Sequence, residues 1–191
     1  LKHLYNVQYD PANEIIITVG VSEALYLAMN ALLDPGDEVI IPTPCFVSYQ
    51  AEVLLAGGVP VEVPSHPEDN FQLDPAQIRS SITPRTKAIL IGYPNNPTGA
   101  VTSRQVLIEV AKIAEEHNLL ILSDEIYDRL VFNHAHVCVP ALGEATRRRT
   151  VLSTRYLPPS RIVRYDLNPA IIPFDSVLLT NTTTNSNIHQ P

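Results

Sequence analysis

The feature that most constrains this chain is the alternation of short β-branched runs with segments of helical period. This alternation is typical of parallel strands that are joined by crossover helices. Helices are predicted to begin near residues 22, 46, 74 and 103, and strands are predicted over 15–19, 39–41, 59–63, 87–91 and 119–123. The sequence therefore predicts an α/β fold, a mostly parallel sheet with helices on both faces.

The character of the sequence changes after about residue 152. From residue 151 onward there is no Gly, no Lys and no helical period, while the last twelve residues are rich in Asn and Thr. Only brief apolar runs, such as 176–180, could pair as a strand. We therefore expect one partial α/β domain over 1–152 and an unrelated, irregular and poorly ordered tail over 153–191.

Composition narrows the classes of partner. The net charge is −7 and the only basic run is Arg147–Arg149, which argues against nucleic acid as a partner and favours a solvated helix end. Two cysteines, Cys45 and Cys138, form neither a disulfide framework nor a metal set, which fits a cytoplasmic setting. No apolar run approaches the ~20 residues of a membrane span. The first residue is not Met, so we expect the chain to begin inside a longer reading frame.

Three polar segments directly follow predicted strands. They are Gly-Val-Ser at 20–22, Asn-Asn-Pro-Thr-Gly at 95–99 and Asp-Glu-Ile-Tyr at 124–127. Each has an ordinary structural explanation, as a helix cap, a loop or a turn. Ligands of parallel sheets nevertheless bind outside the carboxyl ends of the strands, so the three segments are predicted to face one crevice.

Taken together, these segments resemble the class I/II aminotransferases of fold type I, which depend on pyridoxal phosphate. That family carries a Val-Gly-x-Ser-Glu-Ala turn, a Pro-Asn-Asn-Pro-Thr-Gly loop and a Ser-Asp-Glu-Ile-Tyr strand end, and all three stand in this chain in the same order. Asp-Pro-Gly-Asp-Glu-Val at 34–39 and Pro-Cys-Phe-Val-Ser-Tyr at 44–49 lie between the turn and the loop. The resemblance covers residues 1–152 and implies a truncated large domain.

The resemblance implies a role for three polar side chains around the pyridine ring of the cofactor. Asp124 holds the position of the carboxylate that keeps the ring nitrogen protonated, so that the ring can accept electrons. Asn96 and Tyr127 resemble the pair that hydrogen-bonds the phenolate oxygen of the ring.

The remaining implied contacts are with the face and the phosphate of the cofactor. Phe46 resembles the aromatic residue that stacks on the ring, although a core Phe at a helix start is its plain alternative. Val21 and Ser22 resemble the phosphate cradle, where the amino-terminal end of a helix favours an anion. The resemblance implies no metal.

The lysine that the family uses is missing. In the family it lies in a Ser-x-x-Lys segment a little beyond the position of Thr150, where it holds the cofactor covalently and moves the substrate's α-proton. The lysines of this chain are Lys2, Lys87 and Lys112. Lys87 opens a strand and so lies at the wrong edge of the sheet, and Lys112 is expected to face solvent from mid-helix. The chain as given is therefore expected to be catalytically incompetent.

Several functional hypotheses remain open at this point. The intact relative would move an amino group between an amino acid and a 2-oxo acid, whereas carbon–sulfur lyases of the same fold share the Asn-Pro-Thr-Gly and Asp-Glu patterns. A third hypothesis makes the chain a non-catalytic partner or decoy, in a homodimer or in a heterodimer with a full-length aminotransferase. A nucleotide-binding doubly wound domain is disfavoured, because the sequence has no Gly-x-Gly-x-x-Gly or Gly-Lys-Ser/Thr turn.

Overall fold

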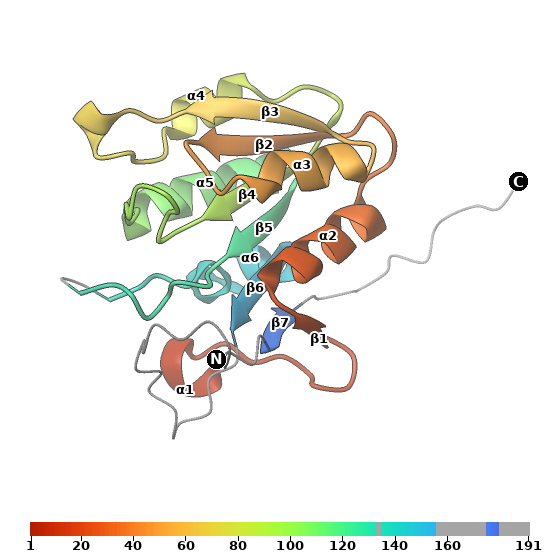
Figure 1. Cartoon of the computed structure of the whole chain (residues 1–191). Coiled ribbons are helices and arrows are strands. Elements are labelled where there is room, and N and C mark those ends of the chain that lie inside the picture. The colour runs from red at the N-terminus through yellow and green to blue at the C-terminus, as the bar shows by residue number, and fades with distance from the viewer. Residues whose placement is uncertain (133–134, 156–174, 180–191) are drawn as a thin grey trace, which may run out of the picture.

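The computed structural model describes residues 1–132, 135–155 and 175–179, and these form an α/β fold around one mixed sheet. In Figure 1 the seven strands of the described residues follow the order β1-β7-β6-β5-β4-β2-β3. Neighbours from β3 to β6 pair in parallel, and β7 is antiparallel to both β1 and β6. The strands are β1 (Ile15–Val19), β2 (Glu38–Thr43), β3 (Val59–Pro64), β4 (Thr86–Gly92), β5 (Leu120–Asp124), β6 (Thr150–Arg155) and β7 (Asp175–Leu179).

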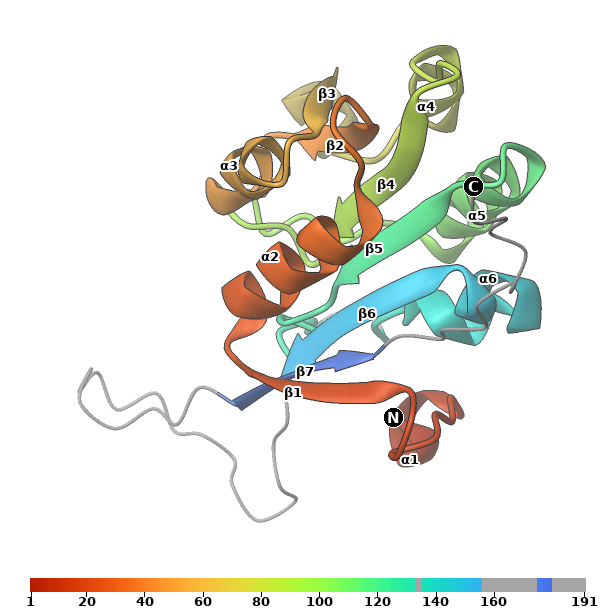
Figure 2. The same ribbon diagram turned by 90° about the vertical axis from the view of Figure 1, so that its right-hand side faces the viewer.

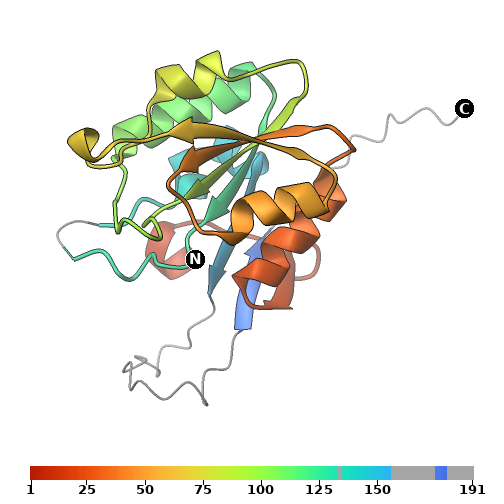
Figure 3. The ribbon, with the colours of Figure 1, turned by 45° about the horizontal axis from the view of Figure 1, so that its top comes forward.

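Helices cover both faces of this sheet, as the sequence predicted. Figure 2 shows α2 and α3 on one side and α4, α5 and α6 on the other, and Figure 3 shows α2 and α3 side by side. The helices are α1 (Lys2–Tyr5), α2 (Val21–Leu32), α3 (Ser48–Leu55), α4 (Pro75–Ser80), α5 (Arg104–Glu116) and α6 (Glu144–Arg148), with short 3-10 turns η1 (Pro67–Asp69) and η2 (Val139–Leu142).

The strands of the sheet centre are apolar on both faces because both faces are covered. On β4, Leu90 packs in the cluster under α2 and α3, whereas its neighbours Ile89 and Ile91 pack in the cluster under α4 and α5. On β6, Val151 belongs to the first cluster and Leu152 packs against the segment that precedes β1. Successive side chains of a strand point to opposite faces of the sheet, and here both faces are buried. The near-continuous apolar runs of the sequence follow from this.

Capping residues in the sequence predicted the starts of two helices correctly. Asp74 and Ser103 cap α4 and α5: Asp74 Oδ1 accepts hydrogen bonds from the N–H groups of Ala76 and Gln77, and Ser103 Oγ accepts one from that of Val106. The predicted helix at 46–56 begins two residues later than expected, at Ser48. Phe46 therefore lies in the turn before α3.

The strongest departure from the sequence prediction concerns residues beyond 150. Strand β6 runs from Thr150 to Arg155, across the predicted boundary at 152, and it was not predicted as a strand. Strand β7 matches the suggestion that 176–180 could pair, and it lies between β1 and β6. The remaining tail residues, 156–174 and 180–191, lie outside the described residues. The sheet therefore includes residues from both sides of the predicted boundary.

Candidate functional site

The carboxyl ends of β1, β4 and β5 meet at one edge of the sheet, because β1 and β6 run in the same direction on either side of β7. A pocket of about 280 Å³ lies at this edge. Its lining contains all six residues that the sequence singled out, Val21, Ser22, Phe46, Asn96, Asp124 and Tyr127, together with Val19, Gly20, Tyr49, Pro94 and Ile126. The structure thus brings the three loop segments together, and the roles of the six side chains toward a cofactor stay a prediction.

One wall of the pocket is the beginning of α2. Gly20 precedes the helix with φ of 89°, a left-handed conformation that suits glycine, and provides no capping side chain. The first helical hydrogen bond runs from the Ala24 N–H to the Gly20 carbonyl, so the N–H groups of Val21 and Ser22 precede the helical ladder. Free N–H groups and the positive end of the helix dipole make this turn suited to an anion such as a phosphate.

Asp124, the last residue of β5, forms the acidic part of the pocket. Its side chain is buried, with Oδ2 accepting a hydrogen bond from Tyr49 Oη at 2.8 Å and Oδ1 accepting one from the Ile126 N–H at 3.1 Å. Burial raises the pKa of Asp124 to about 6, despite these two bonds, which favour the charged form. A carboxylate held in this way would bind strongly to a cationic hydrogen-bond donor.

Glu125, the residue after Asp124, has a different role. Glu125 is buried on the other side of the strand end, where Oε1 accepts hydrogen bonds from Ser123 Oγ and the Val139 N–H, and Oε2 lies 2.7 Å from His136 Nε2. Glu125 therefore links β5 to η2 and to the segment before it. Of the Asp-Glu pair only Asp124 lines the pocket.

Tyr49 is a residue of the site that the sequence analysis did not single out. It lies on the buried face of α3, its hydroxyl donates to Asp124, and its ring meets that of Phe46 edge to face with centroids 5.7 Å apart. Gly92 makes room for it, because a Cβ at that position would overlap the Tyr49 hydroxyl. A signal was available: Tyr49, Glu52 and Val53 follow the spacing of one helix face.

The two asparagines of the Asn-Asn-Pro-Thr-Gly loop have different roles. Asn95 is buried and shapes the loop: its side chain donates to the Pro44 carbonyl and accepts from Thr98 N–H and Oγ1. Asn96 lines the pocket, and its Nδ2 donates a long hydrogen bond of 3.5 Å to Tyr127 Oη. The structure therefore places Asn96 and Tyr127 as neighbours at the rim of the Asp124 pocket.

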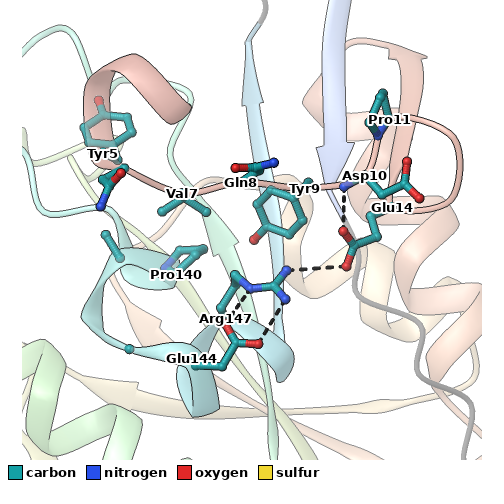
Figure 4. A pocket seen from close by; sticks show the side chains of 13 residues that line it. Tyr5, Val7, Gln8, Tyr9, Asp10, Pro11, Glu14, Pro140, Glu144 and Arg147 are labelled. Atoms are coloured by element: carbon teal, nitrogen blue, oxygen red, sulfur yellow. Dashed lines mark hydrogen bonds and ion pairs between the residues drawn. The ribbon is translucent and has the colours of Figure 1, made fainter.

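A larger hollow of about 870 Å³ lies beside the amino-terminal ends of β1 and β6, away from the Asp124 pocket. Figure 4 shows its centre, where Arg147 forms ion pairs with Glu14 and Glu144 and stacks over Tyr9. Arg147 is thus engaged within the hollow, whose lining comes from the segment before β1, from η2 and from α6, and not from the carboxyl ends of the parallel strands where ligands of such sheets bind. We therefore take the smaller pocket as the functional site.

The three lysines lie away from the pocket. Lys87 is at the amino end of β4, with Nζ 4.0 Å from Asp37 Oδ2, and Lys112 is exposed in mid-α5, both as the sequence predicted. Lys2 is exposed in α1. None of the three lines the pocket.

Two kinds of feature are absent from the described residues. Among them, no group of three or more His, Cys, Asp and Glu side chains could hold a metal ion. No helix in the described part of the chain is long and apolar enough to cross a membrane. Cys45 and Cys138 are free thiols.

Known proteins resemble the chain over most of the described residues. The family model described as aminotransferase class I and II matches residues 1–154. The putative aminotransferase YugH of Bacillus subtilis is 44% identical over 153 residues, which cover 80% of this chain and 40% of that protein. An aspartate/prephenate aminotransferase of Thermus thermophilus is 50% identical over 123 residues, which cover 64% of this chain and 32% of that protein.

Solved structures agree with the sequence matches. The aromatic aminotransferase of Pyrococcus horikoshii superposes with a TM-score of 0.82 at 33% identity, covering 94% of this chain and 46% of that one. The aspartate aminotransferase of Thermus thermophilus with maleate gives 0.76 at 38% identity, covering 87% and 41%. The chain thus spans less than half the length of these relatives. It belongs to the class I and II aminotransferase family.

Proposed function

We propose that this chain is the pyridoxal-phosphate-binding part of an aminotransferase large domain. The observation that carries the proposal is the convergence of Ser22, Asn96 and Asp124, from three distant segments, on one pocket. A helix start suited to phosphate and a buried carboxylate suited to a protonated ring nitrogen lie in the same cavity. The residues present therefore fit the cofactor of this family.

Each residue of the pocket would contact a different part of the cofactor. The N–H groups of Val21 and Ser22 and the Ser22 hydroxyl would hold the phosphate, and Asp124 would keep a proton on the ring nitrogen. Asn96 and Tyr127 would hydrogen-bond the ring oxygen, and Phe46 would pack on the ring face. When bound, pyridoxal phosphate supplies an electron sink for bonds at the carbon that carries the amino group.

In the longer protein this site would serve the transfer of an amino group between an amino acid and a 2-oxo acid. The chain by itself has no lysine in the pocket, so it lacks both a covalent tether and a general base for that reaction. We propose that it binds the cofactor without covalent attachment and does not turn over substrate.

The binding proposal is tested with pyridoxamine 5′-phosphate, which carries the ring and the phosphate but cannot react with a lysine. Asp124→Asn preserves the size of the side chain and removes its charge. We expect its Kd at pH 8 to rise about 30-fold or more, because breaking a buried charged pair costs about 2–5 kcal/mol. The measurement is a fluorescence titration of the full chain.

Asp37→Asn is the matched control, because Asp37 lies at the opposite edge of the sheet, near Lys87. Its Kd should equal that of the wild-type chain. Equal affinity of the Asp124→Asn and wild-type chains, or the absence of saturable binding by the wild type, would contradict the proposal.

The absence of covalent attachment is tested by borohydride reduction of the chain with pyridoxal phosphate, which fixes the cofactor onto any lysine that holds it. Mass spectrometry should detect no stoichiometric adduct, because no lysine lines the pocket. A full-length aminotransferase treated in parallel should carry one adduct per chain. A stoichiometric adduct on Lys87 or Lys112 would overturn this part of the proposal.

A further inference from the structure

Glu52 is a buried carboxyl group that the proposed function does not use. It lies on α3 one turn after Tyr49, on the helix face that is packed against the sheet, and only 6% of its surface is exposed. Its Oε2 is closed to solvent and has no hydrogen-bond partner among the described residues. A buried carboxyl oxygen without a partner costs free energy, so its presence calls for an explanation.

The charges around Glu52 are acidic. Burial, and after it the negative charge of Asp124, raises the pKa of Glu52 to about 7. The pKa of Tyr49 is also raised. Burial is the largest cause, the Asp124 carboxyl contributes next, and the Glu52 carboxyl contributes less. Glu52, Tyr49 and Asp124 therefore form one electrostatically linked group that extends from α3 to the end of β5.

The elements packed against α3 are α2, β2 and β3, and their titratable groups are engaged elsewhere or lie near solvent. Glu38 of β2 binds Arg85 and Thr83, and Glu23 of α2 accepts a hydrogen bond from the Val19 N–H. Tyr26 of α2 and Glu62 of β3 are exposed. Burial, and after it the negative charge of Glu62, raises the pKa of the Cys45 thiol. Within the described part of the chain, no Lys, Arg or His forms an ion pair with Glu52.

A cation placed at Asp124 would change this balance. Two neighbouring buried carboxyl groups disfavour each other's ionisation, and a positive charge between or beside them favours it for both. If the proposed function holds, the protonated pyridine ring is that cation. Binding of the ring would then favour loss of the proton from Glu52 to bulk water, and the carboxylate so formed would attract the ring.

We propose that Glu52 is a second acidic group of the cofactor site, which strengthens binding of a protonated pyridine ring and releases its own proton as the ring binds. It acts through the field at Asp124 and is not a contact of the ring, since it is absent from the pocket lining. This inference rests on the proposed function and adds a determinant of its pH dependence.

The test compares the full wild-type chain with Glu52→Gln, using pyridoxamine 5′-phosphate at pH values from 5 to 9. At pH 8, where Glu52 would be ionised in the complex, we expect the variant to bind about tenfold more weakly. At pH 5 both chains should bind equally, because the Glu52 carboxyl is neutral. Titration calorimetry in buffers of different ionisation enthalpy should detect release of up to about half a proton more from the wild type near pH 7, where about half of the unliganded chains hold the Glu52 proton.

Two controls separate this effect from damage to the pocket. An analogue of the ligand in which carbon replaces the ring nitrogen carries no ring charge, so wild type and Glu52→Gln should bind it equally. Glu62→Gln removes an exposed charge of β3 and should leave the pH profile unchanged. Glu52→Met, a second neutral variant, should behave as Glu52→Gln does.

The outcomes are distinguishable. If the wild type binds and Asp124→Asn does not, but Glu52→Gln has the wild-type pH profile, the role of Glu52 is overturned while the proposed function stands. Equal weakening of the ring and the carbon analogue by Glu52→Gln would indicate a packing role and overturn it too. If the wild type binds neither ligand, the proposed function fails, and the role of Glu52 fails with it.

Discussion

Truncation after Arg155, which removes β7, is expected to destabilise the fold by roughly 5 kcal/mol. Strand β7 lies between β1 and β6, with five residue pairs to β1 and four to β6. Without it, β1 loses its partner strand and β6 becomes an open edge. Each lost backbone hydrogen bond costs about 0.5–1.5 kcal/mol, and several are lost together. Urea unfolding followed by circular dichroism measures the change.

Truncation after Leu179 is the matched control, because it retains β7, and it should unfold at a higher urea concentration than the shorter chain. A single substitution gives the same test without deletion. Val177 pairs with Ile17 on one side and Thr154 on the other, so Val177→Pro removes a backbone donor from an interior strand. Equal unfolding midpoints of the two truncated chains, with no effect of Val177→Pro, would show that β7 contributes nothing to the sheet.

The second large effect is a loss of stability of the unliganded chain as the pH rises. Burial raises the pKa of Glu52 to about 7 and that of Asp124 to about 6, both above their ordinary values of 4.5 and 3.8. The folded state therefore holds more protons than the unfolded state between about pH 4 and 7. Because stability falls with pH wherever the folded state binds more protons, it should decrease across this window and level off above pH 7.

Glu52→Gln isolates one of the two groups. At pH 8 the variant should be more stable than the wild type by about 2–3 kcal/mol, because it has no carboxyl group to ionise in a buried site. At pH 4.5 the two chains should be nearly equal, since the Glu52 carboxyl is then neutral in the folded state. Urea unfolding at the two pH values measures the difference. A gain in stability of the same size at both would mean that charge is not the cause.

The local elements and the position of the site were readable from the sequence. Strand Ile15–Val19 was predicted with its observed bounds, and Ser103 was correctly predicted to cap α5. These features depend on neighbouring residues, through side-chain period and capping chemistry. The convergence of Ser22, Asn96 and Asp124 was also expected, because residues that follow parallel strands meet at one edge of the sheet.

What the sequence could not decide depends on contacts between distant residues. Strand β6 has polar residues at four of its six positions and no clear alternation, so only its pairing with β5 and β7 defines it. The place of β7 depends on the free edges of β1 and β6; Ser176 pairs with Arg155, 21 residues earlier, and Asp175 pairs with Val19, 156 residues earlier. No local pattern encodes such a pairing.

The sequence by itself determined the fold class, the family and six residues that line one pocket, because those follow from periodicity and from motifs short enough to be read along the chain. Only the tertiary structure decided that Tyr49 donates to Asp124 and that Glu52 is buried one helical turn away. The physical reason is that burial and electric field depend on which helix covers the end of β5. They arise only when α3 packs on the sheet.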